Sequence, residues 1–215
     1  MVTTNRAMRF LAYVLLLLGG VGWFSGFFDI PWATSQYEMP LGDLKGVTVD
    51  SSGDIYCGAQ FYCRVQKYDP EGRFLLSLRI DASGGAFRIR VNQDDELEVA
   101  TARNDQLYRF APKGELLDRK ENVGHFYSDF GAEGEKECRG PENAVYRIKS
   151  SLLFPSVVRI SAGVDETVVS VPVRKWLVMG PFPAWLFWTA AILLLGGIRK
   201  LENKKGKPQP AGAAR

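Results

Sequence analysis

The chain contains three cysteines, and their spacing in the sequence decides which of them could form a disulfide. Cys57 and Cys63 flank residues 58–62, and if this hairpin is symmetric about Gln60, the two thiols face each other across neighbouring strands. A disulfide between Cys57 and Cys63 is then sterically reasonable in an oxidising compartment, and the alternative is a pair of small buried thiols. Cys138 has no obvious mate and could pair with either of the others or stay reduced.

Few other residues could ligate a metal or transfer a proton. His125 is the only histidine, and no motif places a serine, cysteine or carboxylate beside it. Three cysteines and one remote histidine do not have zinc-site spacing. The acidic clusters 94–96 and 133–137 are interpreted as solvated turn and loop residues, because calcium needs six or more converging oxygens. We therefore predict no catalytic residue, no metal and no cofactor.

The charges separate the ends of the chain from its middle. Residues 1–28 and 177–215 hold eight basic residues and one acidic residue, a net charge of +7, whereas residues 29–176 hold 19 basic and 23 acidic residues, a net charge of −4. The +3 of the whole chain therefore reflects its two short ends. With no basic, aromatic surface pattern in the middle, this distribution argues against a nucleic-acid partner.

Two apolar stretches predict two transmembrane helices. Residues 10–28 are uncharged and, at about 1.5 Å per residue, cover roughly one hydrocarbon core; residues 177–199 are uncharged as far as Arg199. A cleaved signal peptide is the alternative for the first stretch, but no small-residue cleavage site follows it. Gly22 and Gly26 are four residues apart, a spacing that predicts a face for close helix packing.

The cations at both ends predict the orientation. Short flanks rich in Lys and Arg stay in the cytoplasm, so residues 1–9 and the basic, disordered tail 200–215 are expected there. Residues 29–176 then lie outside the cytoplasm, in the periplasm if the membrane is a bacterial inner membrane, and in a lumen or at the cell exterior if it is a eukaryotic membrane such as the plasma membrane. The lipid bilayer is thus the first predicted partner.

A shift of 42 residues places residues 46–75 on residues 88–117 without a gap. Among the matched pairs are Val49 with Val91, Lys67 with Arg109, Tyr68 with Phe110, Pro70 with Pro112 and Gly72 with Gly114. The first unit predicts strands at 47–49, from Ile55, at 64–68 and at 74–80, with turns at 50–54 and 69–72. Four strands in a unit of about 40 residues indicate a β-propeller blade.

The first unit resembles the NHL-type propeller repeat, and the second does so less closely. The segments that carry the likeness are Gly46–Asp50, Gly53–Tyr56, Arg64–Asp69 and Glu71–Leu75. The resemblance implies four-stranded blades at about 44–80 and 86–122, with a weaker third unit at 143–173. The glycines and charges of 131–141 predict a mobile loop between the second and third units. NHL propellers usually close with about six blades, whereas this chain has room for three at most. The expected fold is therefore an incomplete, mainly-β domain between two transmembrane helices.

Three functions are compatible with these patterns. The first is a non-catalytic, membrane-anchored interaction or assembly module that binds a protein partner or a second copy of itself. The second is a small-molecule or sugar sensor whose concave face is lined by aromatic residues: Tyr56, Phe61, Tyr62, Tyr108, Phe126 and Tyr127. The third is a metal-dependent hydrolase or lyase, since some NHL-like propellers resemble such enzymes. Three blades and one histidine make the third the weakest of the three.

Overall fold

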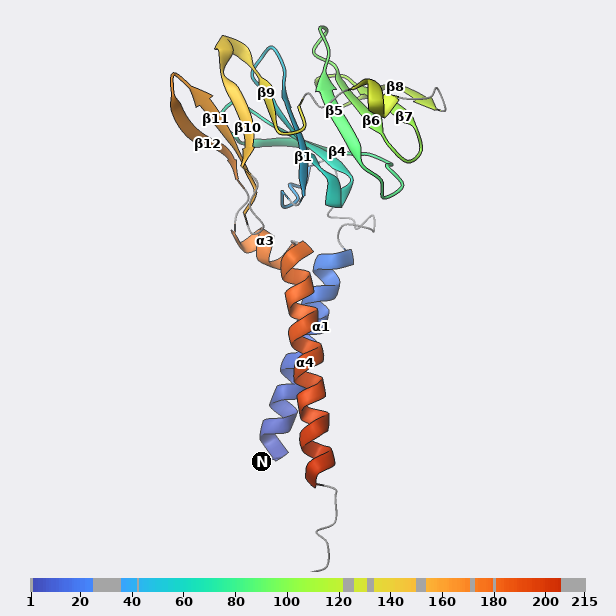
Figure 1. Cartoon of the computed structure of the whole chain (residues 1–215), viewed down its shortest axis with the longest axis vertical. Coiled ribbons are helices and arrows are strands. Elements are labelled where there is room, and N and C mark those ends of the chain that lie inside the picture. The colour runs from blue at the N-terminus through green and yellow to red at the C-terminus, as the bar shows by residue number, and fades with distance from the viewer. Residues whose placement is uncertain are drawn as a thin grey trace, which may run out of the picture.

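Two long helices carry a mainly-β domain at one end (Figure 1). The computed structural model describes residues 2–24, 36–41, 43–121, 126–130, 134–149, 154–170, 173–179 and 181–205. The long helices are α1 (Val2–Phe24) and α4 (Pro181–Lys205), and the short α3 (Val173–Met179) lies between the β domain and α4.

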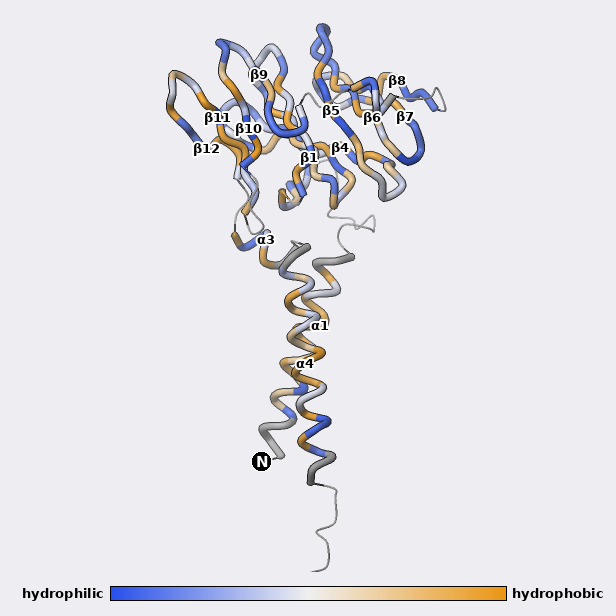
Figure 2. The backbone as a smooth tube through the Cα atoms, in the orientation of Figure 1, coloured by the Kyte–Doolittle hydropathy of each residue, from blue (hydrophilic) through white to orange (hydrophobic). Residues whose placement is uncertain are grey.

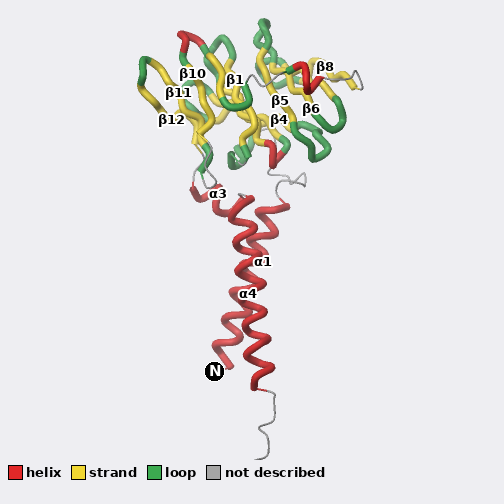
Figure 3. The backbone as a smooth tube through the Cα atoms, viewed as in Figure 1, coloured by secondary structure: helices red, strands yellow, loops and turns green. Residues whose placement is uncertain are grey.

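The β domain consists of three four-stranded antiparallel sheets that resemble propeller blades (Figure 3). Sheet 1 contains β1 (Leu44–Val49), β2 (Ile55–Ala59), β3 (Arg64–Tyr68) and β4 (Phe74–Arg79). Sheet 2 contains β5 (Phe87–Val91), β6 (Leu97–Thr101), β7 (Gln106–Phe110) and β8 (Leu116–Glu121). Sheet 3 contains β9 (Glu137–Arg139), β10 (Val145–Lys149), β11 (Ser156–Ser161) and β12 (Val164–Ser170). The short helices are η1 (Gln60–Tyr62), α2 (Phe126–Asp129) and η2 (Pro141–Asn143).

The repeat is visible in the turns that follow the first strand of sheets 1 and 2. The Asp50 carboxylate accepts hydrogen bonds from the backbone amides of Ser52 and Asp54, at 3.1 and 2.9 Å. At the matching position of sheet 2, the Asn92 amide oxygen accepts them from Asp94 and Glu96, at 3.0 and 2.9 Å. A side-chain oxygen that binds nearby backbone amides fixes a tight turn, so the two units share the same device.

The third unit begins earlier than predicted. The predicted strands near Val157 and Val168 correspond to β11 and β12, which are joined at Ala162–Gly163. The segment 131–141, however, is not simply a mobile loop, because its residues 137–139 form β9 and pair with β10. The glycines and charges of this segment predicted a loop, and β9 has only three residues, which is too short to show an alternating pattern.

Sheet 1 lies between the other two sheets and contributes a separate core to each. One face packs on sheet 2 in a core that includes Tyr56, Val65, Leu78, Ile89, Val99 and Tyr108. The other face packs on sheet 3 in a core that includes Val47, Ile55, Cys57, Tyr68, Tyr146 and Val157. Because successive residues of a strand point to opposite faces, Tyr56 and Cys57 belong to different cores. The spatial order of the sheets is therefore 2–1–3.

The inner strands of sheets 1 and 2 approach closely at glycines. A Cβ atom added to Gly46 in β1 would lie 2.9 Å from the Ile89 Cγ1 atom of β5. Gly134, at a φ of +81°, lies between the same two strands, and its carbonyl accepts a hydrogen bond of 2.8 Å from the Val47 amide. The segment that leads into sheet 3 is thus anchored where the sheets meet.

The face of sheet 2 that points away from sheet 1 is charged instead of apolar. Arg90 and Glu98 pair across β5 and β6 at 2.7 Å, and Arg109 lies 3.6 Å from both Glu96 and Asp118. Helix α2 and the residue after it cover part of this face, where the Arg90 guanidinium lies 4.1 Å from the Phe130 ring centroid. These pairs suit contact with solvent and would be costly to bury against another blade.

Helices α1 and α4 are in direct contact along the part of α1 whose side chains are described. The Trp188 indole donates a hydrogen bond of 3.2 Å to the Leu16 carbonyl, and a Cβ atom on Gly19 would overlap the Trp188 ring. At the ends far from the β domain, Arg9 binds both oxygens of Glu202 at 2.7 and 2.8 Å. Gly26 and the packing at Gly22 lie outside the described residues, so the predicted glycine face stays a prediction.

One helix in the described part of the chain is long and apolar enough to cross a membrane, over Pro183–Glu202. Figure 2 shows apolar residues along both long helices, with hydrophilic colour returning on α4 toward the end away from the β domain. Helix α4 begins at Pro181, whereas residues 177–179 of the predicted span belong to the separate helix α3. Helix α4 also runs past Arg199 to Lys205, so the first residues of the predicted disordered tail are helical.

Candidate functional site

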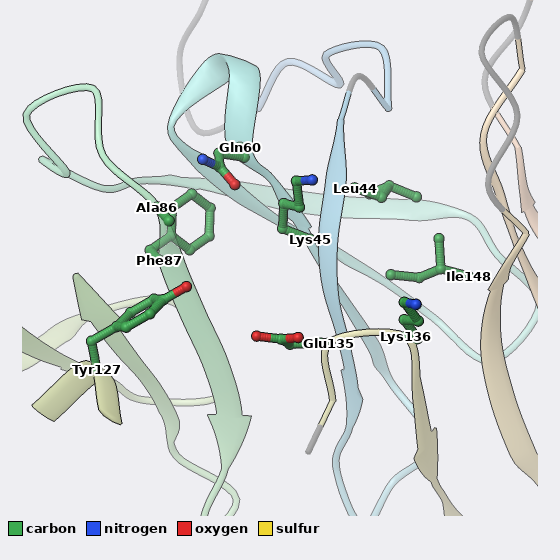
Figure 4. Close-up of a pocket in the computed structure, with 9 residues that line it drawn as sticks. All are labelled: Leu44, Lys45, Gln60, Ala86, Phe87, Tyr127, Glu135, Lys136 and Ile148. Carbon is green, nitrogen blue, oxygen red and sulfur yellow. The ribbon is translucent and has the colours of Figure 1, made fainter. Parts of the chain in front are cut away.

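The strongest candidate site is a cleft where the inner parts of the three sheets meet. It has a volume of about 470 Å³ and is bordered by Leu44, Lys45, Gln60, Ala86, Phe87, Tyr127, Glu135, Lys136 and Ile148. Figure 4 shows the Lys45 side chain, the Tyr127 hydroxyl and the Glu135 carboxylate around one opening. Because its walls come from sheet 1, sheet 2, α2 and the start of sheet 3, the cleft exists only when all three sheets are in place.

One wall of the cleft is held by Arg88. Its guanidinium lies 2.7 Å from the Glu135 carboxylate, donates a hydrogen bond of 2.8 Å to the Tyr127 carbonyl and lies 4.3 Å from the Tyr127 ring centroid. An ion pair and a cation–π contact on one guanidinium fix α2 and the segment before β9 against β5. Arg88 thereby sets the positions of Tyr127 and Glu135.

The rim of the cleft carries two lysines. Lys45 is exposed and lies 3.2 Å from Asp43, and Lys136 is exposed at the start of sheet 3. The Lys136 carbonyl accepts a hydrogen bond of 2.8 Å from the Ile148 amide, which fixes the backbone there. With the Gln60 amide and the Tyr127 hydroxyl nearby, these groups offer hydrogen-bond donors and positive charge to an acidic or carbonyl-rich partner.

A buried charged cluster fixes the neighbouring interface between sheets 1 and 2. Lys67 has a side chain that is only 6% exposed, and its ammonium lies 2.8 Å from Asp54, 3.3 Å from Asp50 and 3.0 Å from the Pro112 carbonyl. The Tyr56 hydroxyl donates to Asp50 at 3.2 Å, and the Lys67 ammonium lies 4.9 Å from the Tyr56 ring centroid. The cluster thus joins the third strand of sheet 1 to a turn of sheet 2.

The pKa values in this cluster follow from burial and from its charges. Burial lowers the pKa of Lys67, but the hydrogen bonds with Asp54 and Tyr56 and the charge of Asp50 outweigh it, so that the net shift is upward. Burial raises the pKa of Tyr56 to about 12, although Lys67 acts in the opposite direction. At neutral pH the cluster therefore contains an ammonium and a neutral phenol, a structural state and not one poised for proton transfer.

The structure corrects the prediction of an aromatic binding face. Tyr56, Tyr62 and Tyr108 are buried, and they fill the cores instead of lining an open surface. The alternation of strands β2 and β7 turns Tyr56 and Tyr108 inward, whereas Tyr62 lies in η1 and packs with Met39 and Ala59. Phe61 is partly buried, edge-on to Tyr62 at 4.9 Å between ring centroids. Only Tyr127 borders the cleft, and the side chain of Phe126 lies outside the described residues.

The facing arrangement of Cys57 and Cys63 is also corrected. The hairpin is not symmetric about Gln60, because η1 and a left-handed residue at Cys63 (φ +49°) precede β3. Cys57 therefore pairs across the strands with Gln66. Cys57 packs in the core shared with sheet 3, whereas Cys63 packs against the core shared with sheet 2. None of the three cysteines takes part in a disulfide in this structure.

Most residues of the cleft had no signal in the sequence. Glu135 was noticed only as part of an acidic cluster, and Lys45, Gln60 and Lys136 stand in no motif. They come together because three sheets converge, which local spacing does not encode. Lys67 lies in the buried cluster outside the cleft, and its match with Arg109 in the repeat did mark its position. Among the described residues, no group of three or more His, Cys, Asp or Glu could hold a metal ion.

No protein-family model matches the chain. No curated protein matches it either. Solved structures with some likeness include virginiamycin B lyase from Staphylococcus aureus, at 16% identity and a TM-score of 0.34 over 61% of this chain and 43% of that one. A catalytically inactive variant of the same lyase with quinupristin gives 17% identity and a TM-score of 0.35 over 65% and 46%.

A third structure with this likeness is a protein of unknown function from Bacteroides caccae, at 17% identity and a TM-score of 0.33 over 60% of this chain and 46% of that one. The chain spans less than half of the length of each of these three proteins. The lyase activity named for two of them is theirs.

Proposed function

We propose that this protein is a two-pass membrane protein whose β domain is a non-catalytic docking module outside the cytoplasm. In this proposal α1 and α4 both cross the bilayer, both ends of the chain lie in the cytoplasm, and the β domain binds a protein partner close to the membrane surface. The cleft and the loops around it supply the contacts.

The observation that carries the proposal is the apolar surface that both long helices leave uncovered. In α1, Phe10 is 71% and Leu17 is 68% exposed; in α4, Ile192 is 64% and Leu193 is 71% exposed. Contiguous apolar side chains on the outside of a two-helix pair would be unfavourable in water and are favourable in lipid. The contact between Arg9 and Glu202 supports one compartment for both ends, because it holds those helix ends side by side.

The contacts of α3, the short helix that follows the β domain, also favour a module held close to the bilayer. Lys175 of α3 pairs with Glu38 at 2.9 Å and lies 5.5 Å from the Tyr37 ring centroid. The ring centroids of Trp176 and Phe154 are 4.9 Å apart. These contacts brace α3 against the segment before β1 and against Phe154 just before β11, and aromatic rings beside lysine are typical of a membrane interface.

The topology is tested by single cysteines in a variant with the three native cysteines replaced. Leu117→Cys lies on exposed β8, and Lys200→Cys lies near the end of α4. A membrane-impermeant maleimide applied to intact cells or spheroplasts should label Leu117→Cys at once and Lys200→Cys only after the membrane is opened. Equal labelling of both from outside, or the reverse order, contradicts the two-pass orientation.

Docking is tested by cross-linking in the membrane followed by purification in mild detergent. The full chain should retain a stoichiometric protein partner, and the double variant Lys45→Glu with Lys136→Glu should reduce its recovery about tenfold. Lys113→Glu, on an exposed turn of sheet 2, is the matched control and should leave recovery unchanged. A chain that purifies as a clean monomer in every case argues against a docking module.

A small-molecule sensor is the second candidate, and only the cleft favours it. Its volume of about 470 Å³ is in the range of ligand pockets, and its lysines suit an anionic ligand. Native mass spectrometry of the purified chain would then show an anionic compound that is lost in Lys45→Glu with Lys136→Glu and kept in Lys113→Glu.

A further inference from the structure

Cys57 occupies the centre of the interface between sheets 1 and 3. It is fully buried in β2, and its neighbours in that core include Val47, Tyr68 and Tyr146. Val47 is its cross-strand partner on β1, so both side chains point toward sheet 3. The thiol is therefore directed at whatever side chains sheet 3 presents to this face.

Cys138 is the residue that sheet 3 presents there. It lies on β9, pairs with Tyr146 of β10 and packs against the core that contains Cys57. Gly140, two residues later and still extended (φ −110°, ψ −169°), is so close to sheet 1 that an added Cβ atom would lie 3.3 Å from the Val49 Cγ1 atom. Residues two apart on an extended segment share a face, so Cys138 also points toward sheet 1.

The electrostatics agree with this placement. Burial raises the pKa of Cys57, and the nearby Cys138 thiol raises it further. Cys63 is in a different place, against the core on the opposite face of sheet 1, which leaves Cys138 as the thiol that shares a core with Cys57.

We propose that Cys57 and Cys138 form a disulfide that ties sheet 1 to sheet 3. This bond is distinct from the Cys57–Cys63 pair that the spacing predicts. It would close a loop that contains the whole of sheet 2, so it would restrict the unfolded chain strongly and hold all three sheets around the cleft. That this disulfide is present in the cell rests on the proposed function, because its formation requires the β domain to lie in an oxidising compartment.

The chemistry needs an oxidant of the disulfide class, such as oxidised glutathione or a dithiol oxidase. Cys138 is partly exposed, so its thiolate attacks the oxidant first, forming a mixed disulfide and releasing one thiol of the oxidant. Cys57 then loses its proton and displaces the second thiol of the oxidant, which completes the bond between Cys57 and Cys138. In total, two protons and two electrons leave the protein and reduce one oxidant disulfide to two thiols.

The experiment begins with the full chain, purified from membranes after rapid alkylation of its thiols. Peptide mapping without reductant should show Cys57 joined to Cys138 and Cys63 alkylated. The Cys63→Ser variant should keep the bond. Reduction should lower the Tm of the wild type by about 10 °C, and it should leave the Tm of Cys138→Ser unchanged. Cys57→Ala serves as the second variant, since it removes the thiol without placing a hydroxyl in the core.

The two ways of failing can be told apart. If both thiols are found alkylated after isolation, but a second sample purified without alkylation forms the Cys57–Cys138 bond on incubation with oxidised glutathione, the placement of the cysteines is correct and the oxidising compartment of the proposed function is wrong. If oxidised glutathione instead joins Cys57 to Cys63, or leaves Cys57 reduced under conditions that modify Cys138, the proposed bond is overturned.

Discussion

Sheets 1 and 2 are built from matching repeat units, yet the same positions meet different surroundings in each. Lys67 of sheet 1 is buried against sheet 2 and contacts two carboxylates, whereas Arg109, its counterpart, is 41% exposed and lies 3.6 Å from its nearest two. Gly46 is pressed against β5, whereas its counterpart Arg88 extends toward α2 and Glu135. The difference shows that the repeat encodes the strands and turns. The sheet packed beside each unit decides how far a given position is buried and how much a substitution there destabilises the fold.

The same contrast accounts for three blade-like sheets that do not close into a ring in the described part of the chain. Sheet 1 has an apolar core on both faces because it lies between sheets 2 and 3. Sheet 2 has an apolar core on one face, and the other carries the pair Arg90–Glu98 and the cover of α2. Sheet 2 therefore ends the row of sheets with a charged face that can contact solvent, where a closed propeller would have another blade.

The largest expected effect is at Lys67. Lys67→Met keeps most of the side-chain volume but leaves the Asp50 and Asp54 carboxylates without their cation, which should cost about 3–5 kcal/mol. Arg109→Met is the matched variant in sheet 2 and should change the free energy of unfolding by at most about 0.5 kcal/mol, because its pairs are exposed. Urea unfolding of the full chain in mild detergent, followed by circular dichroism of the β domain, measures both. Equal losses would mean that burial does not separate the two sheets.

The sequence predicted the local features of the fold well. The 42-residue match identified eight strands and their turns, because turn residues and alternation are encoded within a few positions of one another. It did not reveal that the third sheet would lie beside the first, or that β9 would pair at all, since those outcomes depend on contacts between distant segments. The cleft was missed for the same reason, and the aromatic rings were assigned to the surface because ring type alone does not distinguish one strand face from the other.

A smaller effect is expected at Gly46. Gly46→Ala should destabilise the chain by about 1–3 kcal/mol, because the added methyl would lie 2.9 Å from Ile89 Cγ1 and force the two inner strands apart. Arg88→Ala at the matching position loses an ion pair and a ring contact that are partly exposed, and should cost less than about 1 kcal/mol. Thermal unfolding of both variants with wild type gives the comparison. A tolerated alanine at Gly46 would show that sheets 1 and 2 pack less tightly than described.

The smallest expected effect is at Asp95, whose contact with Ser51 joins a turn of sheet 2 to a turn of sheet 1. Asp95 accepts hydrogen bonds from the Ser51 amide at 2.8 Å and the Ser51 hydroxyl at 2.5 Å, and these lower its pKa. Its counterpart in sheet 1 is Gly53, and both adopt a positive φ, at +59° and +87°. Asparagine tolerates this conformation, so Asp95→Asn should remove the charge without new backbone strain and cost about 0.5 kcal/mol at pH 7.

The pH dependence of that cost distinguishes charge from shape. Because the folded pKa of Asp95 lies below its ordinary value, the contribution of its carboxylate is complete above that value, about 3.9, and is lost as the pH falls through the folded pKa. The difference in unfolding free energy between wild type and Asp95→Asn should therefore be constant from pH 7 to about pH 5 and shrink toward zero near pH 2. A difference that stays constant down to pH 2 would assign the effect to the shape of the turn, and the two turns would then be joined by packing instead of by charge.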